Sequence, residues 1–157
     1  MVVPMGPVRT NIRGAEPAEM GELQALYRRS SMVWDSDRAL MVAHPELVEP
    51  DLETIEGQRV RVAVQNGRLV GFSTVLPAPG DAGELDALFV EPDAMRSGIG
   101  RMLVEDAVVT CRVLGWSRLE VTANPNAVGF YERVGFVKTG TARTQFADAD
   151  RMVLDLG

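Results

Sequence analysis

The sequence predicts an α/β protein built on one mixed β-sheet, with helices on both faces of the sheet. Two patterns predict this fold. Residues 60–76 have the pattern of two strands joined by a hairpin turn, which indicates that antiparallel strands come first. From residue 84 onward strand and helix patterns alternate, the order of a sheet that helices cover on both sides. No repeat or polar linker divides the 157 residues, so we expect a single domain over 1–157.

The first part of the chain is predicted to hold a short strand and a helix. The strand is expected at 8–13 and the helix at 17–31. The helix is indicated by apolar residues at the spacing of one helical face: Met20, Leu23, Leu26 and Tyr27. Pro45 and Pro50 interrupt the stretch 32–56, for which we expect a loop that includes short helices.

A β-hairpin is the clearest local signal. Alternation of apolar residues from Val60 to Val64 indicates a half-buried strand. Asn66 and Gly67 follow, a pair favoured in two-residue hairpin turns because both residues tolerate positive φ. The partner strand is expected at 68–76, and three residues that break strands end it: Pro77, Pro79 and Gly80.

The second half of the chain is predicted to alternate strands and helices. A strand is expected at 84–90, and Pro92 ends it. A helix is expected at 98–115, where apolar residues recur at helical spacing: Ile99, Leu103, Val104, Ala107, Val108, Cys111 and Leu114. The sheet of about six or seven strands is completed by a strand at 116–122, a helix at 126–134, and strands at 135–141 and 151–156.

The composition argues against several classes of function. The chain has 22 acidic and 16 basic residues, and this net charge of −6 disfavours a nucleic-acid partner. No apolar stretch is long enough to cross a bilayer, and the opening residues lack the apolar run of a secretory signal. We therefore expect a cytoplasmic location and no membrane partner. The single cysteine, Cys111, and the single histidine, His44, argue against a disulfide framework and a structural zinc site, so no metal is expected.

A glycine-rich turn between a predicted strand and a predicted helix has the features of an anion site. Free N–H groups at a helix start point outward, and the helix dipole favours negative charge there. Gly98 and Gly100 have no side chain to obstruct a phosphate, and Arg96 and Arg101 can add charged hydrogen bonds. A tight connection would explain the glycines equally well. Neither a P-loop nor a dinucleotide fingerprint fits, because Leu103 stands where the latter needs glycine or alanine.

A second motif, NPNAVGFYERVGF, follows at 124–136. Together the two segments resemble the GNAT acyltransferase superfamily. Its first signature is an aliphatic residue and proline, followed by Arg/Gln-x-x-Gly-x-Gly/Ala at a helix start. Its second is Asn-x-x-Ala-x-x-aromatic-Tyr-x-x-x-Gly-Phe, whose positions are all present: Asn124, Ala127, Phe130, Tyr131, Gly135 and Phe136. The resemblance covers 59–136, with one departure, since Met95 occupies the usual Arg/Gln position and Arg96 follows it.

The resemblance implies a sheet that splays between its fourth and fifth strands, with the pantetheine arm of acetyl-CoA in the cleft. Residues 1–58 would form the acceptor side and 59–157 the acyl-CoA-binding core. The residues that would bind acetyl-CoA are Phe89 and Val90 by their main chain, Asn124 by its side chain, and a phosphate-binding group at the helix start: Arg96, Ser97, Gly98, Ile99, Gly100 and Arg101. Phe89 and Val90 also suit the apolar end of a buried strand. Asn124 before a proline also suits a helix N-cap.

The resemblance also implies catalytic roles. Tyr131 would protonate the departing CoA thiolate, because a phenol with a pKa near ~10 is protonated at neutral pH. A base is needed for the amine, and Glu84 and Asp86 lie two apart in a predicted strand, which directs both to one face. The resemblance slightly favours Asp86, because family members often carry a glutamate near its position. Either carboxylate could instead only attract a cationic acceptor. Cys111 falls on the apolar stripe of its helix, so we expect direct attack of the amine and no acyl-enzyme.

The predicted activity is acetyl transfer from acetyl-CoA to a primary amine of a small molecule or peptide. One alternative is a sensor that binds acyl-CoA without turnover. Another is an enzyme that acetylates a lysine or the N-terminus of a protein. A homodimer is expected only by resemblance.

Overall fold

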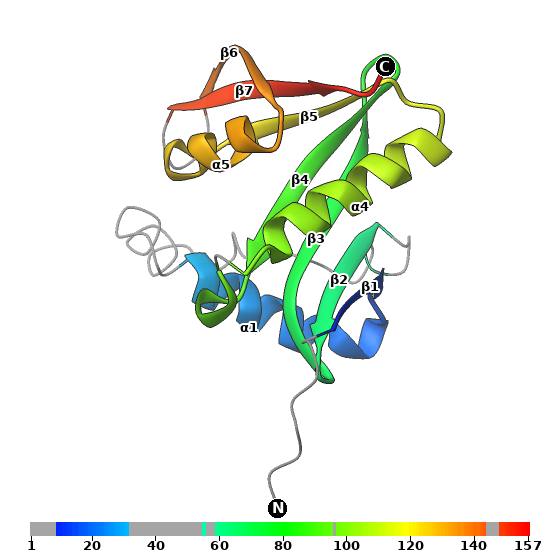
Figure 1. The fold of residues 1–157 in the computed structure, drawn as a ribbon, viewed down its shortest axis with the longest axis vertical. Helices are drawn as coiled ribbons and strands as arrows, with labels where there is room; N and C mark the ends of the chain where they lie inside the picture. Colours follow the sequence, from blue (N-terminus) through cyan, green and yellow to red (C-terminus); the bar gives the residue numbers. More distant parts are fainter. Residues whose placement is uncertain (1–8, 32–54, 56–58, 96, 144–147) are drawn as a thin grey trace, which may run out of the picture.

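A seven-stranded sheet forms the centre of the computed structural model, which describes residues 9–31, 55, 59–95, 97–143 and 148–157 (Figure 1). The strand order is β1-β2-β3-β4-β5-β7-β6, and all neighbours are antiparallel except β4 and β5. The strands are β1 Thr10–Gly14, β2 Val60–Gln65, β3 Arg68–Ala78, β4 Ala82–Val90, β5 Arg118–Ala123, β6 Val137–Arg143 and β7 Asp148–Asp155. The predicted mixed α/β sheet is confirmed.

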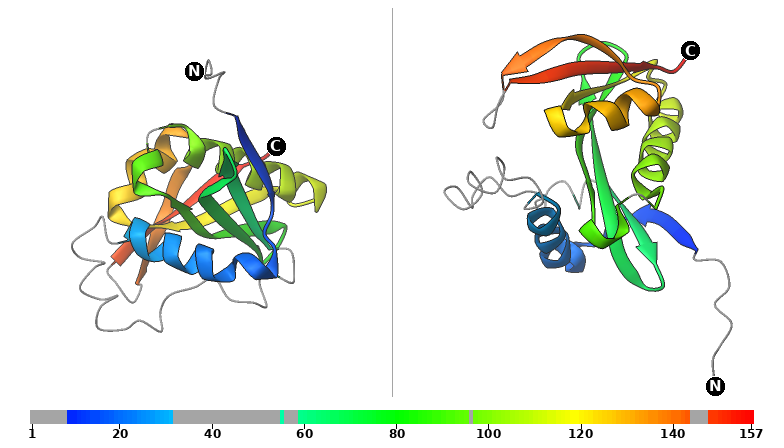
Figure 2. Two further views of the ribbon diagram at one scale, coloured as in Figure 1. Left: turned by 90° about the horizontal axis from the view of Figure 1, so that it is seen from below. Right: turned by 60° about the vertical axis from the view of Figure 1, so that its left-hand side comes forward.

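Three α-helices accompany the described part of the sheet: α1 Met20–Ser31, α4 Ile99–Val113 and α5 Val128–Arg133. Single 3₁₀ turns precede each of them: η1 Pro17–Glu19, η3 Pro92–Ala94 and η4 Pro125–Ala127. Figure 2 shows α1 and α4 on opposite sides of the strands, as expected for helices on both faces. The stretch predicted as a loop at 32–56 lies outside the described residues, apart from Ile55.

Two layers of apolar side chains hold the helices on the sheet. On one face, Leu23 and Leu26 of α1 pack with Phe72 of β3, and all three are completely buried. On the other face, α4 and α5 cover β5 with a buried set that comprises Val104, Ala107, Cys111, Leu119, Val121, Tyr131 and Phe136. Cys111 therefore packs in the core, on the apolar stripe that predicted the helix.

The β2–β3 hairpin forms as its turn residues predict. Asn66 and Gly67 have φ values of 50° and 78°, the left-handed pair that a tight hairpin requires. The second strand is longer than predicted, because β3 continues through Pro77 to Ala78. Proline is tolerated there because β2 pairs with β3 only as far as Thr74, so no neighbour on that side needs the missing N–H.

The sheet opens between β4 and β5. These strands pair only where Ala82, Gly83 and Glu84 of β4 face Arg118, Leu119 and Glu120 of β5. From residue 85 to residue 90, β4 has no strand partner on that side among the described residues, and Figure 1 shows the two strands diverging. This confirms the splayed sheet that the family resemblance implies.

Candidate active site

The open edge of β4 exposes main-chain groups that a β-sheet would normally pair. Glu91 N–H donates to Val70 O of β3 at 2.8 Å. Because main-chain direction alternates along a strand, the groups of Phe89 also face β3, whereas those of Leu88 and Val90 face the divergence. The main chain of Val90 thus faces the divergence, and the main chain of Phe89 does not. The Phe89 ring packs against that of Tyr27, at a centroid distance of 4.6 Å.

A β-bulge interrupts β4 at Asp86. Ala87 pairs with Thr74 and Leu85 with Val75, so Asp86 has no opposite residue on β3. The bulge shifts the two-residue alternation between Leu85 and Ala87, which pack in the clusters on opposite faces of the sheet. The Asp86 side chain is exposed and has no hydrogen bond or ion pair with another described residue. Neighbouring protein atoms nevertheless desolvate its carboxyl, which raises its pKa above the ordinary value.

Glu84 has a different environment, because Arg151 of β7 binds both of its oxygens. Arg151 Nη1 lies 2.7 Å from Glu84 Oε1, and Nη2 lies 3.2 Å from Oε2. The same guanidinium donates to Thr122 Oγ1 at 2.7 Å and lies 3.9 Å from Glu120 Oε1. Since Val121 packs beneath α4 and α5, Thr122 and Glu120 on either side of it face the opposite side of the sheet. The cluster of Glu84, Glu120 and Arg151 therefore lies on the face that α4 and α5 leave open.

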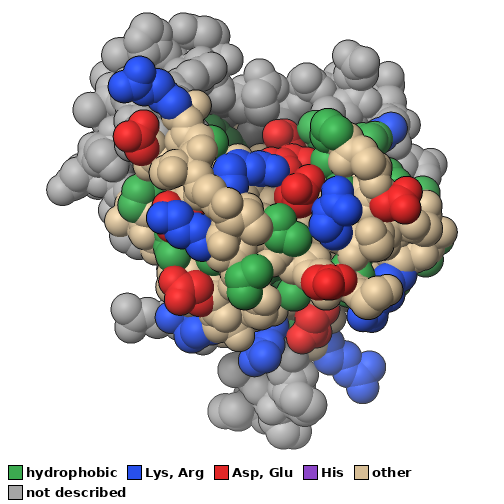
Figure 3. All heavy atoms as spheres, turned by 90° about the horizontal axis from the view of Figure 1, so that it is seen from above, with side chains coloured by type: hydrophobic (Ala, Val, Ile, Leu, Met, Phe, Trp, Pro, Cys, Tyr) green, Lys and Arg blue, Asp and Glu red, His purple; other side chains and the backbone are tan. Residues whose placement is uncertain are grey.

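Charges of both signs mark the end of the molecule formed by β5, β6 and β7. Figure 3 shows acidic and basic side chains interspersed on this end, together with apolar ones. Lys138 of β6 contributes one such pair, because its Nζ lies 3.4 Å from an oxygen of Asp150 on β7. The face drawn in Figure 3 thus has no extended patch of one sign among its described residues.

Tyr131 is held among aromatic rings beside the divergence. Its ring lies 5.2 Å from that of Phe130 and 5.3 Å from that of Phe136, and the residue is 6% exposed. Burial raises the pKa of Tyr131 well above its usual range, and the negative charge of Glu84 adds to this. The phenol is therefore protonated at neutral pH, and Glu84 is near enough to add to the shift although it lies on the other face of the sheet.

The Tyr131 hydroxyl forms no hydrogen bond with a described residue. A buried tyrosine usually satisfies its hydroxyl within the protein. Within the described part of the chain, no group therefore competes with a ligand for this hydroxyl.

The start of α4 presents free N–H groups. Gly98 has a φ of 87°, in the left-handed region that favours glycine, and its C=O accepts the N–H of Met102 at 3.0 Å. The N–H groups of the three residues between them have no acceptor within the helix. Packing also favours glycine at position 100, since a Cβ added there would lie 3.2 Å from the Phe130 ring. α5 thus packs closely on the start of α4.

The polar side chains near this helix start already have protein partners. The Ser97 hydroxyl donates to Ala94 O. Arg101 lies 3.6 Å from Glu105 one turn along α4, and both side chains are exposed. Asn124 accepts the N–H of Asn126 at 2.9 Å, which is the N-cap role that its place before a proline indicates. Arg96 lies outside the described residues.

The structure adds two residues that sequence reasoning missed. Leu88 presents its main chain to the divergence, and Arg151 organises the carboxylates at its base. Strand alternation from Val90 could have identified Leu88. Arg151 belongs to no motif, and its contact with Glu84 spans 67 residues of chain.

Comparison with known proteins shows that the sequence is similar to N-acetyltransferases. The family model described as Acetyltransferase (GNAT) domain matches residues 38–149. The peptidyl-lysine N-acetyltransferase YjaB of Salmonella typhimurium is 36% identical over 132 residues, which are 83% of this chain and 85% of that protein.

Two solved structures share the fold. The PaiA N-acetyltransferase of Thermoplasma acidophilum in complex with coenzyme A has a TM-score of 0.74 at 17% identity, over 94% of this chain and 99% of that one. YncA of Salmonella typhimurium, a putative acetyltransferase with its cofactor acetyl-CoA, has a TM-score of 0.71 at 19% identity, over 95% of both chains.

Proposed function

The chain belongs to the GNAT acetyltransferase family, and from this premise we propose that it transfers the acetyl group of acetyl-CoA to a primary amine by direct attack. The observation that carries the proposal is the unpaired edge of β4, whose Leu85 and Leu88 pack in one cluster with Tyr131. An extended ligand with amide groups can pair with such an edge as an added strand does.

Acetyl-CoA has the chemistry to occupy both parts of this arrangement. Its pantetheine arm would pair with the main chain of Leu88 and Val90. Its pyrophosphate oxygens would accept hydrogen bonds from the free N–H groups of residues 99–101, where the helix dipole favours negative charge. Gly98 leaves this approach open. Asn124 would reach the pantetheine arm while its oxygen continues to cap the turn that follows.

Tyr131 would act as the general acid. When the carbon–sulfur bond of the thioester breaks, the sulfur departs as a thiolate, and the Tyr131 hydroxyl donates a proton to it. Its raised pKa keeps that proton in place at neutral pH. A positioned general acid typically contributes about 100- to 10,000-fold in rate.

Asp86 is the better supported of the two candidate bases. A lysine-like amine has a pKa near ~10.4, so deprotonating it at pH 7 costs about 4.6 kcal/mol. A carboxylate with a raised pKa is a stronger base, and Asp86 has no described partner that competes for a proton. Both oxygens of Glu84 are bound by Arg151. Asp86 would take one proton from the ammonium group directly or through water, and the nitrogen lone pair would then attack the thioester carbon. The second amine proton would leave the nitrogen as the tetrahedral intermediate collapses, and it would restore the Tyr131 hydroxyl that has protonated the thiolate.

The acceptor is proposed to be the amine of a peptide lysine, by analogy with the relative named a peptidyl-lysine N-acetyltransferase. A small-molecule amine and a protein N-terminus are the competing acceptors. The carboxylates Glu84, Glu120 and Asp86 near the divergence favour a cationic acceptor of any of these kinds. A cytoplasmic location and a homodimer belong to the same proposal. No described helix has the length and apolarity needed to span a membrane.

A thiol-release assay with matched acceptors tests the proposal. Purified protein would receive acetyl-CoA and a peptide whose N-terminus is blocked and whose lysine is free. The control is the same peptide with an acetylated lysine. Small polyamines and peptides with free N-termini would form parallel arms. Release above the amine-free rate with the free lysine alone supports peptide acetylation. Binding of acetyl-CoA without release in any arm would favour the sensor.

A further inference from the structure

A buried carboxylate anchors the loop that leads to the start of α4. Glu91 directly follows β4 and is 5% exposed. Arg29 of α1 donates to both of its oxygens, from Nε at 2.6 Å and from Nη2 at 2.8 Å. Arg68 of β3 adds a longer contact, with its Nη2 4.0 Å from Glu91 Oε2. Burying a carboxylate without partners would reduce the stability of the fold by several kcal/mol. The two arginines compensate for this desolvation of Glu91.

The main chain of Glu91 continues this anchor into the loop. Its N–H donates to Val70 O of β3 at 2.8 Å, and its C=O accepts the N–H of Ala94 at 2.9 Å. Ala94 is buried beneath the start of α4, in one cluster with Ile99 and Leu103. The chain from Glu91 to Ile99 is thereby held at both ends. Glu91 is the point at which α1, β3 and this loop meet.

A second contact aligns α1 with the end of β4. Tyr27 precedes Arg29 by two residues, and Phe89 precedes Glu91 by two. The rings of Tyr27 and Phe89 lie 4.6 Å apart, so an aromatic contact and an ion pair join the same two elements side by side. The last turns of α1 are therefore fixed to the strand end that feeds the loop.

We propose that Glu91, clamped by Arg29, is a positioning residue that sets the α4 start for the pyrophosphate of acetyl-CoA. The inference rests on the proposed function. A negative charge close to an anion site opposes binding by Coulomb repulsion, so electrostatics alone gives Glu91 no role there. Its benefit is geometric. The clamp holds the N–H groups at residues 99–101 in one arrangement and removes the need to order the loop on binding.

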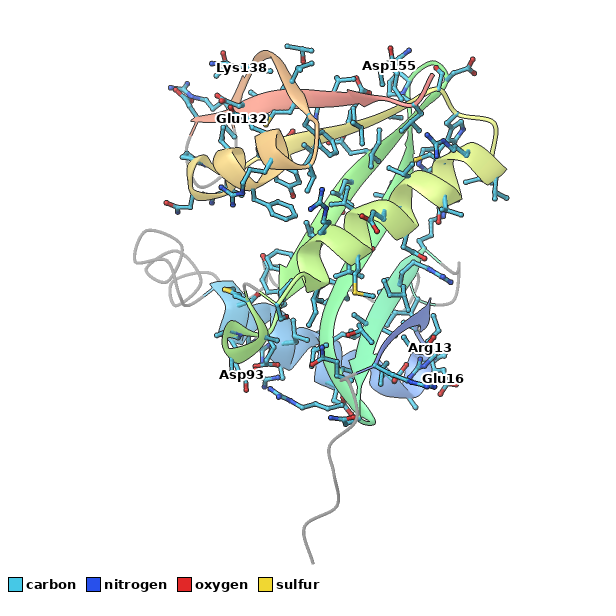
Figure 4. All side chains as sticks on the ribbon, in the orientation of Figure 1. Arg13, Glu16, Asp93, Glu132, Lys138 and Asp155 are labelled. Carbon is cyan, nitrogen blue, oxygen red and sulfur yellow. The ribbon has the colours of Figure 1, made fainter. Side chains whose placement is uncertain are left out.

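The loop offers a matched control for this distinction. Asp93 lies two residues beyond Glu91, where Figure 4 labels it, and it pairs with Arg68 at 2.9 and 3.0 Å. Its side chain is 64% exposed. Glu91→Gln and Asp93→Asn each remove one negative charge from the same loop. Only the first weakens the hydrogen bonds to Arg29.

Acetyl-CoA affinity and steady-state kinetics would be measured for both variants and for Arg29→Gln, whose side chain lies largely at the surface. Glu91→Gln and Arg29→Gln should raise the dissociation constant about tenfold, or about 1.4 kcal/mol. The kcat at saturating acetyl-CoA should remain similar. Asp93→Asn should bind as the unaltered protein does, or slightly more tightly. The double variant Arg29→Glu, Glu91→Arg should recover part of the affinity that Glu91→Arg alone loses.

Equal effects of Glu91→Gln and Asp93→Asn would overturn the positioning role, since charge alone would explain both. A fall in kcat without a change in acetyl-CoA affinity would also overturn it, because a loss of folded protein produces that result. If Glu91→Gln does not fold, unchanged affinity in Arg29→Gln would have the same consequence. Failure of the unaltered protein to bind acetyl-CoA would instead overturn the proposed function, and this inference with it.

Discussion

The carboxylate of Glu84 and the guanidinium of Arg151 meet at 2.7 Å just where β4 and β5 cease to pair. The contact joins β4 to β7 across the intervening β5, because Arg151 is paired with Thr122 in the sheet. One ion pair thus braces the place where β4 and β5 begin to diverge. It also distinguishes Glu84 from Asp86, which the sequence slightly favoured as the base, since Asp86 is left without a described partner.

The first prediction concerns these two carboxylates. Asp86→Asn should lower kcat/KM by about 100- to 10,000-fold, the usual contribution of a general base. Glu84→Gln should have a smaller effect, because the amide oxygen of the introduced glutamine would still accept one hydrogen bond from Arg151. Initial rates with a lysine peptide at pH 7 would compare them. A larger loss from Glu84→Gln than from Asp86→Asn would transfer the role of base to Glu84.

The second prediction concerns stability and pH. Desolvation by neighbouring protein atoms raises the pKa of Asp86 in the folded state above its unfolded value, so folding favours the protonated carboxyl. The group therefore contributes stability below its unfolded pKa, and this contribution is lost as pH rises through the folded pKa. At neutral pH Asp86→Asn should be more stable than the unaltered protein, and the difference should disappear in acid. Urea unfolding at several pH values would measure this. A difference that is independent of pH would contradict it.

The third prediction concerns packing beneath the paired part of β4 and β5. An added Cβ on Gly83 would lie 2.8 Å from the Trp116 ring and 2.9 Å from Cys111 Sγ. Gly83→Ala should destabilise the fold by about 1–3 kcal/mol through overpacking. Gly21→Ala is the control, since nothing lies within 4 Å of its added Cβ and alanine favours helix α1 by about 0.5–1 kcal/mol. Opposite shifts in the urea midpoint are expected. Equal shifts would contradict the packing account.

Much of the fold could be predicted because its signals are local. The left-handed pair Asn66 and Gly67, the strand alternation before it and the apolar stripe of α4 each act over a few residues. The family motif also singled out Tyr131, which packs against residues of both β4 and β5. Each of these features depends on backbone geometry or on the spacing of neighbours in sequence.

The features that escaped prediction depend on contacts between distant segments. The bulge at Asp86 arises from the register between β3 and β4, and no turn residue marks it. The direction of the main chain at Phe89 and Val90 is likewise set by the partner strand. Arg29 and Glu91 are 62 residues apart in sequence, and no motif in the sequence predicts that they form a pair.

Replacement of Tyr131 by phenylalanine tests the central claim most directly. The substitution removes the hydroxyl and retains the ring between Phe130 and Phe136. The account predicts a fall in kcat of about 100-fold or more, with acetyl-CoA affinity little changed. The measurement is single-turnover acetylation of a lysine peptide, with acetyl-CoA binding determined separately on the same preparation. A kcat equal to that of the unaltered protein would contradict the general-acid role.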